Sequence, residues 1–203
     1  MASIALTAGT GSPPRAFAET RMSGRVRLFL PLLILCFSLQ PASAQVDPQS
    51  EHKFKAVYLY NFLKFVDWPD GAFADRSSPV RIGILGNDLL KKLLEETVGS
   101  EMIGDRPVAV TQISSLDQVE TCQLVFVSRS ERESYREILT KVKGKPILTV
   151  GEEEEFFQMG GAVNFYFEGK KLRFEINLKS VKTADLSANS KLLRLAKIVG
   201  SVD

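Results

Sequence analysis

The first pattern in the chain is an apolar repeat that predicts an amphipathic helix. The repeat has three- and four-residue steps, which place its members on one face of a helix. Its members are Phe54, Val57, Tyr58, Phe62, Phe65 and Val66. Pro69 disfavours the α conformation in Trp68, so this helix is expected to end near Trp68. Asp47 and Pro48 suit its start, as a cap and a first helical residue.

Short apolar runs then alternate with further helical patterns. The runs at 80–85, 108–113, 124–127 and 147–150 are expected to be strands, and near-continuous runs are typical of strands that are covered on both faces. The helix after the first run is expected to be capped by Asp88, and Ser130 with Glu133 fits a capping box for the helix that ends near Gly144. Strands that alternate with helices in this way predict a parallel sheet.

The last third of the chain has a different pattern. Residues 162–167 and 172–177 alternate with period two around a turn and predict a β-hairpin. A closing helix is expected over Leu192 to Val199, capped by Ser187 or Asn189. The predicted fold is therefore α/β, a single domain with a mixed, mostly parallel sheet flanked by helices, a C-terminal β-hairpin and a closing helix.

The N-terminal 44 residues have the features of an export signal. Arginines precede a run of about a dozen apolar residues, and Ala42-Ser43-Ala44 offers a cleavage site, so residues 1–44 are predicted to be an N-terminal extension and signal peptide cut after Ala44. Met22 is a credible true start, which would leave residues 1–21 untranslated. The domain is then expected over residues 45–203, exported to the periplasm.

Composition changes the interpretation in two ways. The 203-residue chain has 26 basic and 24 acidic residues, but without residues 1–44 it has 22 basic and 23 acidic residues, a formal charge of −1. A nearly neutral domain gives no electrostatic reason to expect nucleic-acid binding. Cys122 is the one cysteine of that domain, so no internal disulfide is expected. Its apolar neighbours favour a buried thiol over a bridge between chains.

The residues that carry common catalytic or metal chemistry are sparse. His52, the only histidine, is interpreted as a solvated residue of a helix start, and with Cys122 it cannot build a zinc site. Ser50 and Lys53 match a four-residue β-lactamase motif whose partner motifs are absent. The acids of 152–155 fit the first turn of a helix, where they complement the helix dipole. We expect no enzyme activity, no metal and no cofactor.

The predicted parallel sheet offers one place for a small ligand. Ligands of open α/β sheets bind outside the carboxyl ends of the strands. Gly86 and Asn87 follow the first strand, and Ser128 and Arg129 follow the third. These four residues are the candidate ligand crevice of an alternative hypothesis, in which the protein binds and senses a small molecule. No phosphate-binding glycine motif accompanies them.

Several ordered stretches resemble one protein family. They are YNFLKFVDWP at 60–69, LVFVS at 124–128 followed by Ser130 and Glu131, GGAVNF at 160–165, FEIN at 174–177 and LSANSKLL at 186–193. Together they resemble the YfiR-like periplasmic proteins over nearly all of residues 51–199. The resemblance implies a dimeric α/β protein that represses an inner-membrane diguanylate cyclase through its periplasmic region, and so lowers cyclic-di-GMP. It also implies that an OmpA-like outer-membrane lipoprotein sequesters the repressor. The best-known members carry disulfides, which this domain cannot form internally.

The favoured hypothesis is thus a periplasmic regulatory protein that acts through protein–protein contact. Trp68, Pro69 and Lys64 are its candidate partner-binding residues, because they combine an aromatic ring, a polar turn and a cation near the end of the first helix. The alternative reading of Trp68 is that it seats this helix on the sheet, and that of Lys64 is a solvated helix face. The identity of the cyclase, the releasing signal and the dimer interface are not encoded in recognisable motifs.

Overall fold

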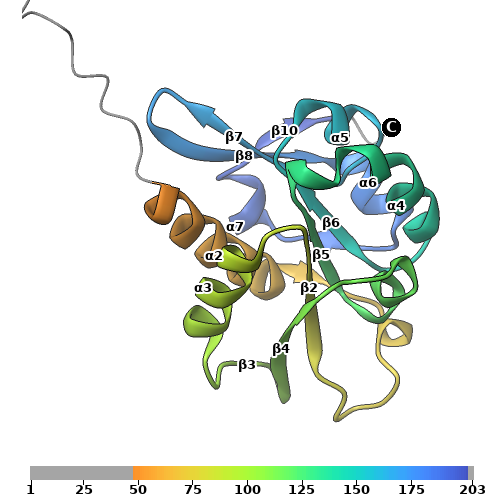
Figure 1. Ribbon diagram of the computed structural model, residues 1–203. Helices are drawn as coiled ribbons and strands as arrows, with labels where there is room; N and C mark the ends of the chain where they lie inside the picture. The colour runs from red at the N-terminus through yellow and green to blue at the C-terminus, as the bar shows by residue number, and fades with distance from the viewer. Residues whose placement is uncertain (1–47, 201–203) are drawn as a thin grey trace, which may run out of the picture. The chain divides into compact units, whose positions relative to one another are not determined.

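The structure is a computed structural model that describes residues 48–200, in which helices cover both faces of one mixed sheet (Figure 1). The predicted signal peptide and its cleavage site lie outside the described residues. The helices, with η for 3-10 helices, are α2 (Pro48–Phe65), η1 (Asp70–Ala72), α3 (Asp88–Val98), η2 (Leu116–Thr121), η3 (Arg129–Ser134), α4 (Tyr135–Val142), α5 (Glu154–Gln158), α6 (Leu178–Thr183) and α7 (Ser190–Leu193).

Eight of the described strands form one sheet in the order β10-β8-β7-β6-β5-β2-β4-β3. The strands are β1 (Val66–Asp67), β2 (Val80–Leu85), β3 (Met102–Ile103), β4 (Arg106–Gln112), β5 (Leu124–Val127), β6 (Leu148–Gly151), β7 (Val163–Glu168), β8 (Lys171–Asn177), β9 (Ser187–Ala188) and β10 (Lys197–Val199). The run from β4 through β2, β5 and β6 to β7 is parallel, and β8 returns antiparallel to β7 as the predicted hairpin. The α/β prediction with a mixed, mostly parallel sheet is confirmed.

Each face of the sheet has its own apolar core. α2 and α3 cover one face, where Phe62 is completely buried among Ile84, Phe126 and Phe165. α4 and α5 cover the other face, where Tyr135 and Phe156 pack edge to face with ring centroids 5.0 Å apart. Burial on both faces explains why the central strands read as continuous apolar runs.

The buried face of α2 differs from the predicted one. Phe54 and Val57 were expected to point to the core, yet their exposed fractions are 57% and 47%. The buried side chains of α2 are instead Lys55, Ala56, Leu59, Phe62 and Leu63. The prediction was wrong at the start of the helix because it assigned the core by hydrophobicity alone, and Lys55 is buried through ion pairs.

Three local predictions also need correction. The predicted closing helix ends at Leu193, and Val199 lies in β10, which pairs with the otherwise open edge of β8. Asn189 does cap α7, as predicted. Asn87, not Asp88, caps α3. The capping box predicted at Ser130 and Glu133 does not form, because the Ser130 hydroxyl donates to the carbonyl of Gly86 and α4 begins only at Tyr135.

The aromatic cluster under α2 generates a stability prediction. The Phe62 ring lies 5.1 Å from the Phe174 ring and 5.8 Å from the Phe165 ring, centroid to centroid. We expect Phe62→Ala to lower the free energy of unfolding by about 3–5 kcal/mol, because it opens a cavity that the sheet cannot fill. Val57→Ala on the same helix, at a half-exposed site, is the control and should cost less than about 1 kcal/mol. Urea unfolding measures both, and equal losses would contradict this packing.

Candidate functional site: the carboxyl edge of the sheet and the start of helix α2

The carboxyl ends of three neighbouring parallel strands meet at one edge of the sheet. β2 is followed by Gly86 and Asn87, β5 by Ser128 and Arg129, and β6 by Glu152. The chain adds β4 on one side of β2 and then crosses over to add β5 on the other side. Such a switch point is where α/β sheets commonly bind ligands. The structure therefore brings the four residues of the predicted crevice to the expected edge.

Hydrogen bonds close this edge from within. The N–H of Ser128 donates to the carbonyl of Leu85 at 3.1 Å, and the Ser130 hydroxyl donates to the carbonyl of Gly86 at 3.1 Å. Gly86 has a φ of +75°, and a Cβ built there would lie 2.2 Å from the Ser130 hydroxyl oxygen. A glycine is thus required for the turn itself, and the space over it is already filled.

A buried lysine links α2 to this edge. Lys55 is 1% exposed, and its ammonium lies between the carboxylates of Glu51, one turn earlier on α2, and Glu152, at 2.5 Å from Glu152 Oε2. A buried ammonium is tolerated only when charged partners and hydrogen bonds replace its water. Two carboxylates from opposite sides meet this requirement.

Glu152 is the centre of the cluster. Its Oε1 atom accepts hydrogen bonds from the Ser128 hydroxyl (3.2 Å), the Arg129 N–H (2.9 Å) and the Arg129 Nε–H (3.3 Å). Burial by itself raises the pKa of Glu152, but the Lys55 charge, with Arg129, outweighs burial and lowers the pKa from 4.5 to about 2. The same carboxylate raises the pKa of Arg129. Glu152 is therefore ionised at neutral pH and has its acceptors occupied.

A second contact joins α2 to the first strand turn. His52 Nε2 lies 2.9 Å from Asn87 Nδ2, while the Asn87 side-chain oxygen accepts from the Leu90 N–H at 2.9 Å and caps α3. His52 is half-buried, so its interpretation as a solvated surface residue was wrong. The start of α2 is thus held by the turns after β2, β5 and β6.

We name the cluster of Glu51, Lys55, Ser128, Arg129 and Glu152 the clamp, because its ion pairs and hydrogen bonds hold the start of α2 against the edge of the sheet. Its ammonium and its central carboxylate are paired with each other, which leaves neither as a general acid or base. The cavity beside it, lined in part by Arg129, Glu152 and Asn164, has a volume of about 180 Å³. Small-molecule sites usually occupy about 300–1,000 Å³. No group of three or more His, Cys, Asp or Glu residues within 48–200 is arranged to hold a metal ion.

Sequence reasoning missed Lys55, Glu51 and Glu152. Glu152 was interpreted as one of four solvated acids, although it directly follows a buried strand, as Gly86 and Ser128 follow theirs. Lys55 lies four residues before the buried Leu59, on the core face of α2. A lysine on a core face, together with an acid at a strand end, was the available signal.

The three predicted partner-binding residues lie at the other end of α2. The Trp68 indole N–H donates to the carbonyl of Gln123 at 3.3 Å, and the ring is partly buried against the core. Pro69 is half-buried and Lys64 is exposed, with its ammonium 5.1 Å from the centroid of the Tyr60 ring. Trp68 thus seats the end of the helix on the sheet; contact of these residues with a partner stays a prediction.

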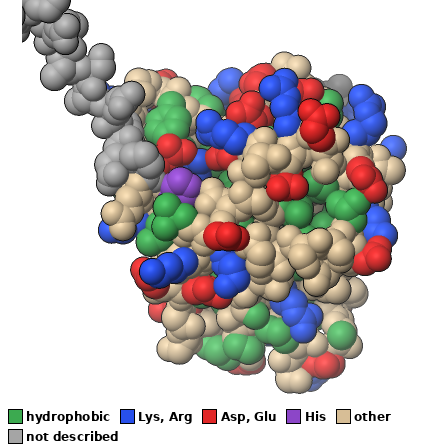
Figure 2. All heavy atoms as spheres, in the orientation of Figure 1, with side chains coloured by type: hydrophobic (Ala, Val, Ile, Leu, Met, Phe, Trp, Pro, Cys, Tyr) green, Lys and Arg blue, Asp and Glu red, His purple; other side chains and the backbone are tan. Residues whose placement is uncertain are grey.

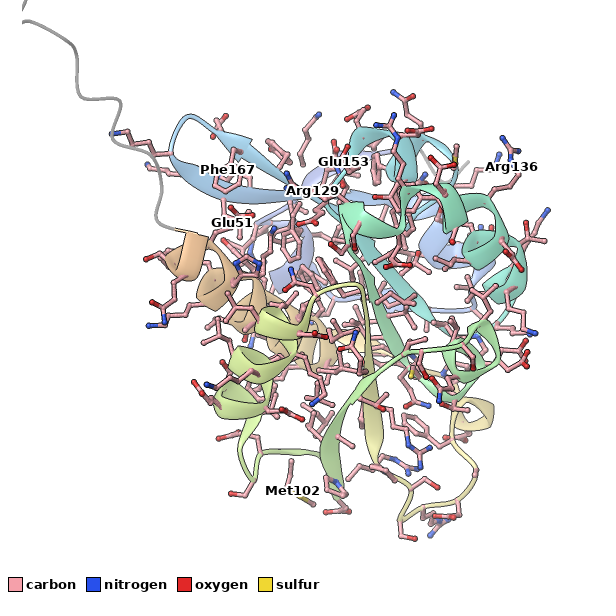
Figure 3. The ribbon with its side chains drawn as sticks, viewed as in Figure 1. Glu51, Met102, Arg129, Arg136, Glu153 and Phe167 are labelled. Atoms are coloured by element: carbon pink, nitrogen blue, oxygen red, sulfur yellow. The ribbon has the colours of Figure 1, made fainter. Side chains whose placement is uncertain are left out.

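An exposed apolar groove lies where α2 begins and the hairpin ends. We name it the α2–hairpin groove; it has a volume of about 290 Å³ and is lined by Glu51, Phe54, Tyr58, Phe167, Lys170, Lys171, Leu172 and Arg173. Figure 3 shows Phe167 on the hairpin close to Glu51 at the start of α2. Phe54 and Phe167 are 57% and 42% exposed. Sequence analysis missed this groove because it placed Phe54 in the core.

The charges around the groove are uneven. Arg173 pairs with Glu168 and Glu51 pairs with Lys55, whereas Lys170 and Lys171 form no ion pair with any residue of 48–200. Elsewhere on the face shown in Figure 2, acidic and basic side chains are intermixed. The groove therefore combines two exposed aromatic rings with two unpaired ammonium groups.

Two other findings concern the described residues as a whole. Cys122 is buried as a free thiol, and burial raises its pKa, which keeps it protonated and unreactive.

None of the helices between residues 48 and 200 has the length and apolar character needed to cross a bilayer.

The clamp generates a prediction about stability. Glu152→Gln removes one of the two charges that compensate the buried Lys55 ammonium. We expect a loss of about 3–5 kcal/mol in the free energy of unfolding, because one partner of a buried ion pair is removed. Glu133→Gln, at an exposed acid of η3, should change stability by less than about 0.5 kcal/mol. Denaturant unfolding of both variants at pH 7 measures the difference.

The clamp also predicts a pH dependence. The pKa of Glu152 is about 2 in the fold against an ordinary value of 4.5, so its contribution to stability is complete above pH 4.5 and is lost as the pH falls toward 2. The stability advantage of the wild-type protein over Glu152→Gln should therefore shrink steadily between pH 5 and pH 2.5. An advantage that stays constant over this range would contradict the assignment.

This chain is similar to solved structures and to one protein family. Among solved structures, an ABC domain in complex with L-Trp from Streptococcus pneumonia is similar with a TM-score of 0.44 and 11% identity, over 59% of this chain and 56% of that one. A conserved domain protein from Vibrio cholerae O1 biovar eltor is similar with a TM-score of 0.47 and 9% identity, over 76% and 60%. This chain thus spans less than two thirds of either structure.

The sequence itself is more informative than these structures. No curated protein matches the chain. The family model described as YfiR/HmsC-like matches residues 52–197, which include α2 from His52 onward, Lys55 and Glu152 of the clamp, the hairpin and the first residue of β10. The resemblance inferred from the sequence motifs is confirmed, and the chain belongs to the YfiR/HmsC-like family.

Proposed function

We propose that this protein is a periplasmic regulator that represses a membrane-bound diguanylate cyclase by direct contact with the cyclase's periplasmic region. Membership of the YfiR/HmsC-like family supports this role. Repression then follows from differential affinity: a bound regulator favours the inactive cyclase only as far as it binds that state more tightly. The outcome in the cell is less cyclic-di-GMP.

The observation that carries the proposal from the structure is the α2–hairpin groove. Exposed aromatic rings are favoured anchors of protein interfaces, because they bury a large area with little loss of side-chain entropy. The titratable groups of the adjacent clamp are satisfied by one another, so the neighbouring surface offers contact area rather than reactive groups.

The groove also constrains the chemistry of its partner. Lys170 and Lys171, which form no ion pair with a residue of 48–200, line the groove together with Phe54 and Phe167. The complementary surface is an apolar side chain flanked by acidic residues, which would fill the groove and pair with the two lysines. We propose that the periplasmic region of the cyclase presents this surface.

The remaining parts of the proposal rest on the family and on the sequence. Residues 1–44 serve as the export signal that delivers residues 45–203 to the periplasm, and the protein acts as a homodimer. An OmpA-like lipoprotein of the outer membrane would release the cyclase by sequestering the regulator. Sensing of a small molecule at Gly86, Asn87, Ser128 and Arg129 has less support. The Ser130 hydroxyl fills the space over Gly86, and the cavity that Arg129 lines, about 180 Å³, is smaller than most small-molecule sites.

The proposal predicts a change in cellular cyclic-di-GMP. Deletion of the gene should raise the nucleotide, and the exported protein should restore the original level, whereas a version that lacks residues 1–44 should not, because it stays on the wrong side of the membrane. Cyclic-di-GMP in extracts measures this. An unchanged level in the deletion strain under several growth conditions would contradict repression.

The groove predicts which residues matter for that effect. The double variant Phe54→Ala and Phe167→Ala should be exported normally yet leave cyclic-di-GMP within about twofold of the deletion strain. The matched control is Met102→Ala with Leu195→Ala, two apolar residues that are 48% and 64% exposed elsewhere on the surface. Repression that survives in the groove variant but not in the control would place the contact surface elsewhere.

A further inference from the structure

A third cavity, larger than the two described above, does not share any lining residue with them. It has a volume of about 500 Å³ and opens between α4, the turn after α5, and α6. We name it the α4–α6 pocket. Its volume falls within the range of small-molecule sites, unlike the cavity beside the clamp.

The buried side chains that line the α4–α6 pocket, which we call its floor, are apolar except for Thr149. Val142, at the end of α4, and Ile147, directly before β6, are 6% and 4% exposed, and Ala162 and Ala184 contribute further methyl groups. The half-buried Leu139 side chain completes this surface. A ligand with an apolar body gains free energy by covering such a floor.

The rim of the pocket is cationic. Arg136 and Lys143 of the α4 segment and Lys179 of α6 are exposed and line the opening, and the lining contains no aspartate or glutamate. Figure 3 shows Arg136 extending from α4 away from the core. None of these three side chains forms an ion pair with a carboxylate of residues 48–200.

The other cations near α4 behave differently. Lys141 and Lys145 pair with Asp117 and Glu120 of η2, and Arg132 pairs with Glu155. The segment thus has paired cations on the side that faces η2 and α5, and unpaired ones on the side that faces the pocket. Three unpaired cations around one opening create a positive potential that attracts an anion.

We propose that the α4–α6 pocket binds a small organic anion, with its negative group at the cationic rim and its apolar body on the floor. This site is separate from the α2–hairpin groove and does not depend on the function proposed above. Floor and rim together exclude two simpler ligands: an inorganic anion would leave the floor uncovered, and a neutral apolar molecule would gain nothing from the rim.

The test uses naphthalene-1-sulfonate as probe and the neutral naphthalene-1-methanol as its matched analogue. Isothermal titration of the mature chain, residues 45–203, at low salt should detect the sulfonate and give at least tenfold weaker binding of the alcohol. Binding of the sulfonate should weaken further in 0.5 M NaCl, because salt screens exposed charges. Equal affinity for both probes, or no binding of the sulfonate, overturns the proposal.

Variants then locate the bound probe. The triple variant Arg136→Gln, Lys143→Gln and Lys179→Gln should weaken binding of the sulfonate about tenfold. The control triple Lys53→Gln, Lys92→Gln and Lys182→Gln removes the same charge from exposed lysines outside the pocket and should leave the affinity within twofold. Equal weakening by both triples would mean that the effect follows net charge alone, which contradicts a site at the rim.

A steric variant tests the pocket without altering its charge. Thr140→Trp places a large ring on an exposed lining position of α4 and should abolish binding of the sulfonate, whereas Thr121→Trp, an exposed threonine outside the lining, should not. Far-ultraviolet circular dichroism and the thermal midpoint of each variant establish that it is folded. Unchanged binding by a folded Thr140→Trp protein overturns the proposal.

Discussion

The position of helix α2 depends on one buried charge, the Lys55 ammonium. It lies between Glu51 on its own helix and Glu152 at the end of β6, and Glu152 is held in turn by the hydroxyl of Ser128 and by Arg129 after β5. A buried cation without both partners would be strongly unfavourable, so α2 can neither rotate nor slide along the sheet without breaking the pairs. The start of α2 and the carboxyl ends of β5 and β6 therefore form one structural unit.

The exposed groove is a consequence of this clamp. Successive residues of a helix are rotated by about 100°, so directing Lys55 into the sheet turns Phe54 away from it. The β7–β8 hairpin extends beyond the sheet on the same side and adds Phe167 to the surface that Phe54 leaves open. A polar interaction inside the fold thereby creates an apolar surface outside it, and that surface is the one through which we propose regulation.

Much of the fold was predictable from the sequence, because apolar runs and glycine turns are local signals. The strand 80–85, the run at 124–127 and the hairpin all appear where the pattern placed them. Non-local effects caused the errors. Val199 lies in a strand because it pairs with the edge of β8. The Ser130 hydroxyl donates to the carbonyl of Gly86 instead of forming a capping box. Lys55 is buried because its ammonium pairs with Glu152, 97 residues away.

In the candidate sites, too, local signals were predictable from the sequence and non-local interactions were not. Gly86, Asn87, Ser128 and Arg129 could be brought together from the sequence alone, because parallel strands end at a common edge. Their internal hydrogen bonds could not, since these depend on Glu152 and on the exact approach of α2. That Arg136, Lys143 and Lys179 lack an ion-pair partner in the described part of the chain likewise follows only from where the acids of η2 and α5 lie.

We propose that the start of α2 and the β7–β8 hairpin together form the surface that contacts the cyclase. Hydrogen–deuterium exchange of the mature protein, with and without the periplasmic region of the cyclase, tests it most directly. New protection is expected in peptides that cover residues 48–58 and 166–173. Protection confined to the turns after β2 and β5, or to the end of α2 around Trp68, would contradict it.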